Sequence, residues 1–243
     1  GEGVVLCAPA WREYMRTHSA FRQIADQLAH RGFHVLRFDY YGTGDSGGEG
    51  HEGSLDAWQR DVKAASHELK EVAGVDRISA LGLRLGASLA LLALCEEPVS
   101  RLILLDPVVE GVRYLAELEE DHHRLQAGIE ALPWRSELGR PAELGDSLRT
   151  ELCGFRMSAD MPKALAEIDL TQIQDCKSRY LTLLVSRQRS DWGGLESTLT
   201  ACCAGVVKVV ESPAVGFWEA TLEETALLPK GVLELVVSQL SNH

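Results

Sequence analysis

The sequence is poor in several features that define whole classes of protein. Lys and Arg number 24 against 36 Asp and Glu in 243 residues, and the resulting net charge of −12 disfavours binding to the phosphate backbone of nucleic acids. No apolar run reaches the roughly 18 residues that a membrane span needs, and the first residues lack the basic and apolar blocks of a signal peptide. We therefore expect a soluble cytoplasmic protein that binds neither nucleic acid nor membrane.

Metal-binding and cofactor-binding patterns are also missing. The six cysteines form no C-x-x-C pair and no zinc-type spacing, and most lie in apolar stretches where a free thiol behaves as a small hydrophobic group. The glycine-rich residues 42–48 lack the Lys-Ser/Thr end of a phosphate-binding loop. We expect reduced cysteines, no metal and no cofactor.

What is present is an alternation of short β-rich runs with helical patterns, which is typical of an α/β protein with a largely parallel sheet. Ser19 is expected to cap the first helix, and the second helix is expected to start at Ser54 and to end at Gly74. The expected strands are residues 4–7, 33–39, 77–83, 101–105, 180–186 and 206–211.

The alternation breaks between residues 110 and 170, where charged residues and helix formers are punctuated by prolines. We expect residues 111–170 to form a helical cap insertion above a core built from residues 1–110 and 171–243. No repeat or flexible linker indicates a second independent domain.

Residues 78–87, ISALGLRLGA, have the pattern of a strand, a Gly-x-X-x-Gly turn and an apolar helix, which is the frame of a nucleophile elbow. The position of the nucleophile holds Arg84. A guanidinium cannot be deprotonated at useful pH and has no attacking atom, so ordinary serine-hydrolase chemistry from this turn is excluded.

The segment LRFDYYGTGDS (36–46) resembles the post-strand loop of the α/β-hydrolase-fold superfamily, to which the chain is similar over nearly its whole length. More narrowly, the chain is similar to a subgroup with arginine in the elbow, and the segments that carry this resemblance are GLRLGA (82–87), LDPVV (105–109), ELCGF (151–155) and GFWE (216–219). That subgroup includes exosortase-associated hydrolases and hydrolase-like proteins of polyketide and peptide natural-product clusters. The resemblance implies an α/β-hydrolase fold with an acyl substrate.

The catalytic triad that the resemblance implies is degenerate. Asp191 matches the acid after the penultimate strand, but residues 212–217 contain no histidine to serve as the base. The nearest hydroxyl is that of Ser88, one helical turn after Arg84 on the same face. Ser88 is either a replacement nucleophile or a buried helix serine that bonds a carbonyl one turn back.

The resemblance further implies an oxyanion hole made by the amide of Leu85 and that of Ala10 or Trp11. Arg84 would then help to hold a carbonyl oxygen or an anion. Alternatively, Arg84 turns inward and plugs the pocket by pairing with an acidic residue, for which the candidates are Asp106, Asp191 and Glu211.

Aromatic residues are few but fall at expected strand ends or in the loops beyond them. They favour a flat hydrophobic or aromatic acyl ligand, although core packing accounts for some equally well. These residues are Trp11, Tyr40, Tyr41, Trp192 and Trp218.

Three functions remain open. The first is an acyltransferase or thioesterase-type enzyme of natural-product biosynthesis, acting on a carrier-bound thioester through a non-standard site that includes the oxyanion amides and the catalytic candidates Arg84, Ser88 and Asp191. The second is a catalytically inactive pseudo-hydrolase that binds an acyl ligand or a partner protein, and the third is an ordinary esterase. The association of the subgroup with biosynthetic clusters favours the first. The sequence sets neither the acyl group, the acceptor nor the oligomeric state.

Overall fold

A parallel sheet forms the centre of the computed structural model, which describes residues 1–130, 151–185, 192–211 and 229–241. The strand order within these residues is β2-β1-β3-β4-β7-β8, and every neighbouring pair is parallel. The strands are β1 (Glu2–Cys7), β2 (His34–Arg37), β3 (Arg77–Leu83), β4 (Arg101–Leu105), β7 (Tyr180–Val185) and β8 (Val206–Glu211). Because all strands run the same way, their carboxyl ends meet at one edge, where crevices form in such sheets.

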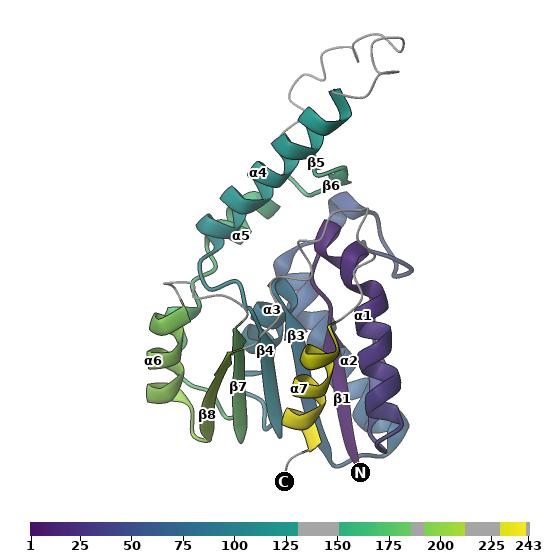
Figure 1. Cartoon of the computed structure of the whole chain (residues 1–243), viewed down its shortest axis with the longest axis vertical. Helices are drawn as coiled ribbons and strands as arrows, with labels where there is room; N and C mark the ends of the chain where they lie inside the picture. Colours follow the sequence, from purple (N-terminus) through teal and green to yellow (C-terminus); the bar gives the residue numbers. More distant parts are fainter. Residues whose placement is uncertain (131–150, 186–191, 212–228, 242–243) are drawn as a thin grey trace.

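Helices cover both faces of the sheet (Figure 1). Residues of α1 and α7 pack with one face in one hydrophobic cluster, while α2, α3 and α6 pack with the other. The bounds are α1 (Trp11–Ala29), α2 (Leu55–Ala73), α3 (Leu85–Leu94), α6 (Trp192–Cys202) and α7 (Lys230–Ser241), with a short 3-10 helix η1 (Gly50–Glu52) before α2. The expected fold class, an α/β protein with a parallel sheet, is confirmed. None of the described helices has the length and apolarity needed to cross a membrane.

Most expected boundaries are confirmed where local chemistry sets them. The Ser54 hydroxyl accepts from the Ala57 amide at 3.2 Å, and Gly74 ends α2 in the left-handed conformation with φ 60°. The expected cap at Ser19 is wrong, because α1 already begins at Trp11 and Ser19 lies inside it. Ala10 precedes α1 without a side-chain cap bond, so the start carries no capping signature in the sequence.

Above the carboxyl edge of the sheet, the described part of residues 111–170 forms a long helix and smaller elements (Figure 1). The helix α4 packs on α5, and Gly111 lies so close to the Leu165 carbonyl that a Cβ could not fit. The elements are α4 (Gly111–Glu130), β5 (Glu151–Leu152), β6 (Phe155–Arg156) and α5 (Met161–Ala166), followed by the 3-10 helix η4 (Leu170–Gln172). The division into core and cap stays a prediction.

Candidate functional site around Arg84

The turn between β3 and α3 has the strained geometry of a strand-to-helix elbow. Arg84 has φ 53° and ψ −124°, a conformation that side-chain-bearing residues rarely adopt. A Cβ on Gly82 would collide with the backbone of Ala87, and one on Gly86 with the Cys7 and Ala8 carbonyls. The two glycines therefore let α3 pack directly against the strand it follows and against the end of β1.

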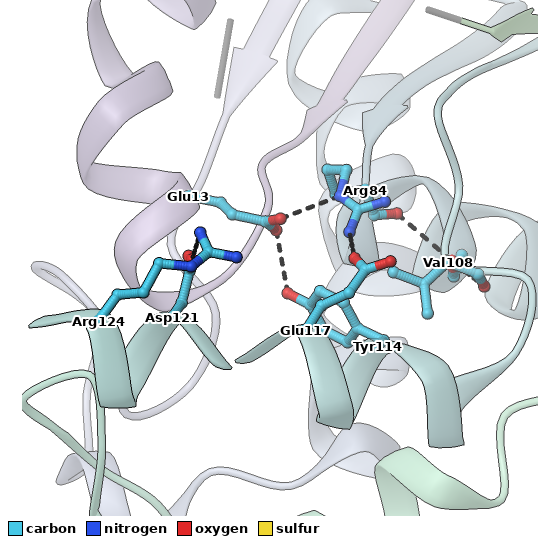
Figure 2. Close-up of polar contacts among 8 residues, drawn as sticks. Glu13, Arg84, Val108, Tyr114, Glu117, Asp121 and Arg124 are labelled. Atoms are coloured by element: carbon cyan, nitrogen blue, oxygen red, sulfur yellow. Dashed lines mark hydrogen bonds and ion pairs between the residues drawn. The ribbon is translucent and has the colours of Figure 1, made fainter. Parts of the chain in front are cut away.

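The Arg84 side chain lies buried between two carboxylates from different elements (Figure 2). Its Nε donates to Glu13 Oε1 at 2.9 Å, and its Nη2 donates to Glu117 Oε2 at 2.6 Å. Glu13 stands in the first turn of α1 and Glu117 on α4. The guanidinium is only 2% exposed, so it joins the elbow, α1 and α4 in one ionic cluster.

Tyr114, one turn before Glu117 on α4, completes this cluster. Its hydroxyl donates to Glu13 Oε2 at 2.9 Å, and the Arg84 guanidinium carbon lies 5.3 Å from the centre of its ring. Burial lowers the pKa of Arg84, but the combined effect of Glu13, Tyr114 and Glu117 raises it by more than burial lowers it. The net shift of the pKa is therefore upward, and the cation is stabilised. Burial and the nearby Glu13 raise the pKa of Tyr114 well above its ordinary value, which keeps it a neutral donor.

Among the described residues, the carboxylates that form ion pairs with Arg84 are not the candidates Asp106 and Glu211 that the sequence offered. Arg84 does turn inward, but the carboxylates it meets belong to α1 and α4. Glu211 lies on the edge strand β8, separated from β3 by β4 and β7, and Asp191 lies outside the described residues. The sequence signal for Glu13 was an acidic residue in a first helical turn, which became visible only once α1 was known to begin at Trp11.

Ser88 lies on α3 with its side chain enclosed by the core. Its Oγ donates to the Val108 carbonyl at 2.8 Å, and the Arg84 carbonyl one turn back lies at 3.3 Å. The residue is 0% exposed. Its environment is that of a satisfied buried helix serine, and a nucleophilic role for it stays a prediction.

The backbone segments expected to form an oxyanion hole do lie side by side. Cys7 at the end of β1 pairs with Gly82 of β3, which places Ala10 and Trp11 next to the elbow. Trp11 begins α1 with φ 51°, and Leu85 is the first residue of α3. Binding of an oxyanion by these amides stays a prediction.

Two of the expected ligand-binding aromatic residues are core residues. Tyr40 stacks on Trp58 with ring centres 5.3 Å apart and donates its hydroxyl to the Ala8 carbonyl at 3.1 Å. Trp11 lies 5.6 Å from Trp58 and is likewise buried. Trp192 is half-buried at the start of α6, and Trp218 lies outside the described residues.

A cavity of about 250 Å³ lies beside α1, at the carboxyl ends of β1 and β2. Arg84 and Ser88 are not among its lining residues, which are Leu6, Ala8, Tyr14, Thr17, His18, Phe21, Arg37, Phe38, Asp39 and Asp45. Within the described ranges, no three His, Cys, Asp or Glu side chains are grouped to hold a metal ion.

A parallel sheet with a strained elbow after β3, a neighbouring loop after β1 and an insertion after β4 defines the α/β-hydrolase fold. The family model for serine aminopeptidase, S33, matches residues 2–135, more than half of the sequence. The chain therefore belongs to this family of α/β hydrolases.

Solved structures with similar folds include several hydrolases. An esterase from Pyrococcus furiosus, Pf2001, has 17% identity and a TM-score of 0.62 over 98% of this chain and 82% of its own. A hydrolase from Pseudomonas aeruginosa PA01 has 21% identity and a TM-score of 0.61 over 99% and 90%. Est1E from Butyrivibrio proteoclasticus with ferulic acid bound has 16% identity and a TM-score of 0.58 over 99% and 86%. No curated protein matches the sequence.

Proposed function

We propose that this member of the hydrolase family handles acyl groups without an acyl-enzyme intermediate. It would accept an acyl thioester, such as one presented by a carrier protein, and pass the acyl group directly to water or to another acceptor. We also place it in the subgroup with arginine in the elbow, whose biosynthetic associations favour a thioester substrate.

The observation that carries this proposal is the buried guanidinium of Arg84 at the position of the nucleophile. A serine there would form a covalent acyl ester, whereas a cation there can only bind and polarise an acyl oxygen. The contact of Nε with Glu13, which Tyr114 also holds, fixes the orientation of the guanidinium.

Direct transfer balances without any group on the protein becoming acylated. The acceptor oxygen or nitrogen attacks the thioester carbon, the carbon–sulfur bond breaks, and the departing sulfur takes up the proton that the acceptor loses. Arg84, the adjacent amide of Leu85 and the amide of Ala10 or Trp11 would stabilise the negative charge that develops on the acyl oxygen.

A second candidate, an acyl-binding protein without catalysis, is favoured by one specific observation. Arg84 is 2% exposed and already bonded to both Glu13 and Glu117. Such a closed cluster resembles a binding or structural centre as much as a catalytic one.

The test is turnover of a panel of aliphatic and aromatic acyl thioesters, followed by thiol release and by the intact mass of the protein. The aromatic members are included because the similarly folded Est1E binds ferulic acid. We expect wild type and Ser88→Ala to release thiol, no acyl mass to be added, and Arg84→Met and Arg84→Lys each to lose at least about tenfold in rate. A fluorophosphonate should label no serine stoichiometrically.

Ser66→Ala is a matched control, because Ser66 is also a helix serine bonded to a carbonyl one turn back, on α2 away from the elbow. An acyl adduct lost in Ser88→Ala but kept in Ser66→Ala would overturn direct transfer in favour of Ser88 as the nucleophile. Binding of a loaded carrier with neither adduct nor turnover would overturn the enzyme and support the binding protein.

A further inference from the structure

The access of an external ligand to Arg84 depends on the side chains that are bonded to it. A guanidinium 2% exposed can meet an external ligand only if a neighbouring side chain moves aside. The two carboxylates bonded to it differ in exposure to solvent, so they are not equally able to move.

Glu13 is the firmly placed carboxylate. Its side chain is 13% exposed, and its two oxygens are both engaged, Oε1 by Arg84 and Oε2 by the Tyr114 hydroxyl. It also stands in the first turn of α1, where the helix dipole stabilises negative charge. Removing Glu13 from Arg84 would therefore break several favourable interactions at once.

Glu117 is the more exposed of the two. Its side chain is 33% exposed, and it reaches Arg84 from α4, the helix that stands above the sheet edge (Figures 1 and 2). Water can solvate a carboxylate in such a position when it leaves, so its departure costs less than that of a fully buried group.

We infer that Glu117 is an exchangeable occupant of an anion site on Arg84, and that the carboxylate of a free acyl acid binds there by taking its place. The step is the exchange of one carboxylate for another. The Glu117 oxygen leaves Arg84 Nη2 and an oxygen of the acid binds there, while the contact of Nε with Glu13 is kept. This inference rests on the proposed function, since the acid is the free form of the acyl group to be handled. It adds that the free acid is recognised by the negative charge on its carboxylate oxygens.

Replacement of Glu117 by a ligand carboxylate also affects α4. Tyr114 and Glu117 lie three residues apart on one face of α4, and both contact the Arg84 cluster. When a ligand displaces Glu117, α4 loses its ionic link to the elbow and keeps the Tyr114 contact. The backbone around Glu117 should then open more often.

The experiment is calorimetric titration of the full chain with acetate, hexanoate and benzoate, each paired with its neutral amide. Glu117→Gln keeps the size of the side chain and removes its charge, so it should bind the carboxylates about tenfold more tightly than wild type, and the amides should not bind. Glu119→Gln, an exposed position on the same helix, should behave as wild type. In wild type, hexanoate but not hexanamide should speed hydrogen exchange at amides near Glu117.

Two results would overturn the inference: a Glu117→Gln variant that binds carboxylates no more tightly than wild type, or amides that bind as well as their acids. The exchange measurement needs no variant, so it decides the question even if Glu117→Gln folds poorly. Absence of thioester turnover would contradict the proposed function, but the binding results would still support the carboxylate site on Arg84. Thioester turnover without any preference for carboxylates over amides in binding would contradict this inference and leave the proposed function intact.

Discussion

Arg84 is an expensive residue to bury, and the molecule arranges its neighbours to stabilise it. An isolated guanidinium in a protein interior is strongly unfavourable, and its removal from a completed cluster leaves buried carboxylates without compensation. The same cation excludes serine chemistry at the elbow and, in our proposal, recruits an acyl oxygen. In this proposal, stability and function depend on the same three side chains, Arg84, Glu13 and Glu117.

At this scale we predict that Arg84→Met lowers the free energy of unfolding at pH 7 by about 3–5 kcal/mol, because two carboxylates lose their shared cation. A double-mutant cycle with Glu13→Gln should show a coupling of about 1–3 kcal/mol, larger than the coupling with Glu117→Gln, since Glu117 is the more exposed. Urea unfolding of the single and double variants measures both. Equal couplings would show that Glu117 is as firmly placed as Glu13.

Among the elements, α4 occupies an intermediate position between core and solvent. Its first half contributes the buried residues Tyr114 and Leu118 to the hydrophobic core, and Glu117 of the same half meets the elbow. From Glu119 to Gly128, every residue of the helix is partly or fully exposed. The helix is thus anchored in the core near Gly111, whereas its later half is more exposed and is held to the β5–β6 hairpin by the Cys153 amide, which donates to His122 Nδ1 at 2.9 Å.

This arrangement predicts a gradient of hydrogen exchange along α4. Amides after Glu119 should exchange fastest, those between Gly111 and Leu118 more slowly, and both faster than the β3 amides around Leu81 by roughly two orders of magnitude or more. Mass spectrometry of peptides from native-state exchange resolves the three groups. If the whole of α4 were protected as well as Leu81, the cap would be an integral part of the core rather than a cover that can move.

For the molecule as a whole, a partly buried tyrosine links two separate elements, and its phenol and a buried thiol stay protonated at neutral pH. The Tyr14 hydroxyl of α1 donates to Asp39 Oδ1 at 2.8 Å in the loop after β2, and Asp39 Oδ2 accepts from the Asp45 amide at 3.0 Å. Burial, followed by the bond and the charge of Asp39, raises the pKa of Tyr14 to about 12. Burial alone raises the pKa of the Cys7 thiol to about 12.

Because the pKa of Tyr14 is raised in the folded state, the free energy of unfolding must fall as the pH rises past the pKa of the unfolded chain. An unfolded tyrosine titrates near pH 10, so above that pH the unfolded chain has lost protons that the folded chain retains, and stability falls. The stabilising contribution of Tyr14 is complete below about pH 10 and disappears as the pH rises through about 12. The difference in unfolding free energy between wild type and Tyr14→Phe should therefore shrink over this interval, as urea titrations at each pH would show. A constant difference from pH 9 to 12 would contradict the assignment.

The sequence by itself determined what depends on neighbours along the chain. The pattern of residues 77–83 predicted β3 with its observed bounds, Ser54 and Gly74 predicted the two ends of α2, and the glycines at 82 and 86 predicted the elbow and the place of Arg84 in it. Capping, periodicity and glycine geometry are local, so a few consecutive residues are enough to specify them.

Only the tertiary structure decided what surrounds Arg84 and Ser88. Glu13 and Glu117 lie 71 and 33 residues from Arg84, and Val108 lies 20 residues from Ser88. The contact of each depends on where α1, α4 and the segment after β4 pass over the carboxyl edge of the sheet. Acidic residues number 36 in this chain, and nothing local marks which of them will meet the elbow. The physical reason is that hydrophobic packing of whole helices sets their positions, and the ion pairs form between the side chains that this packing brings together.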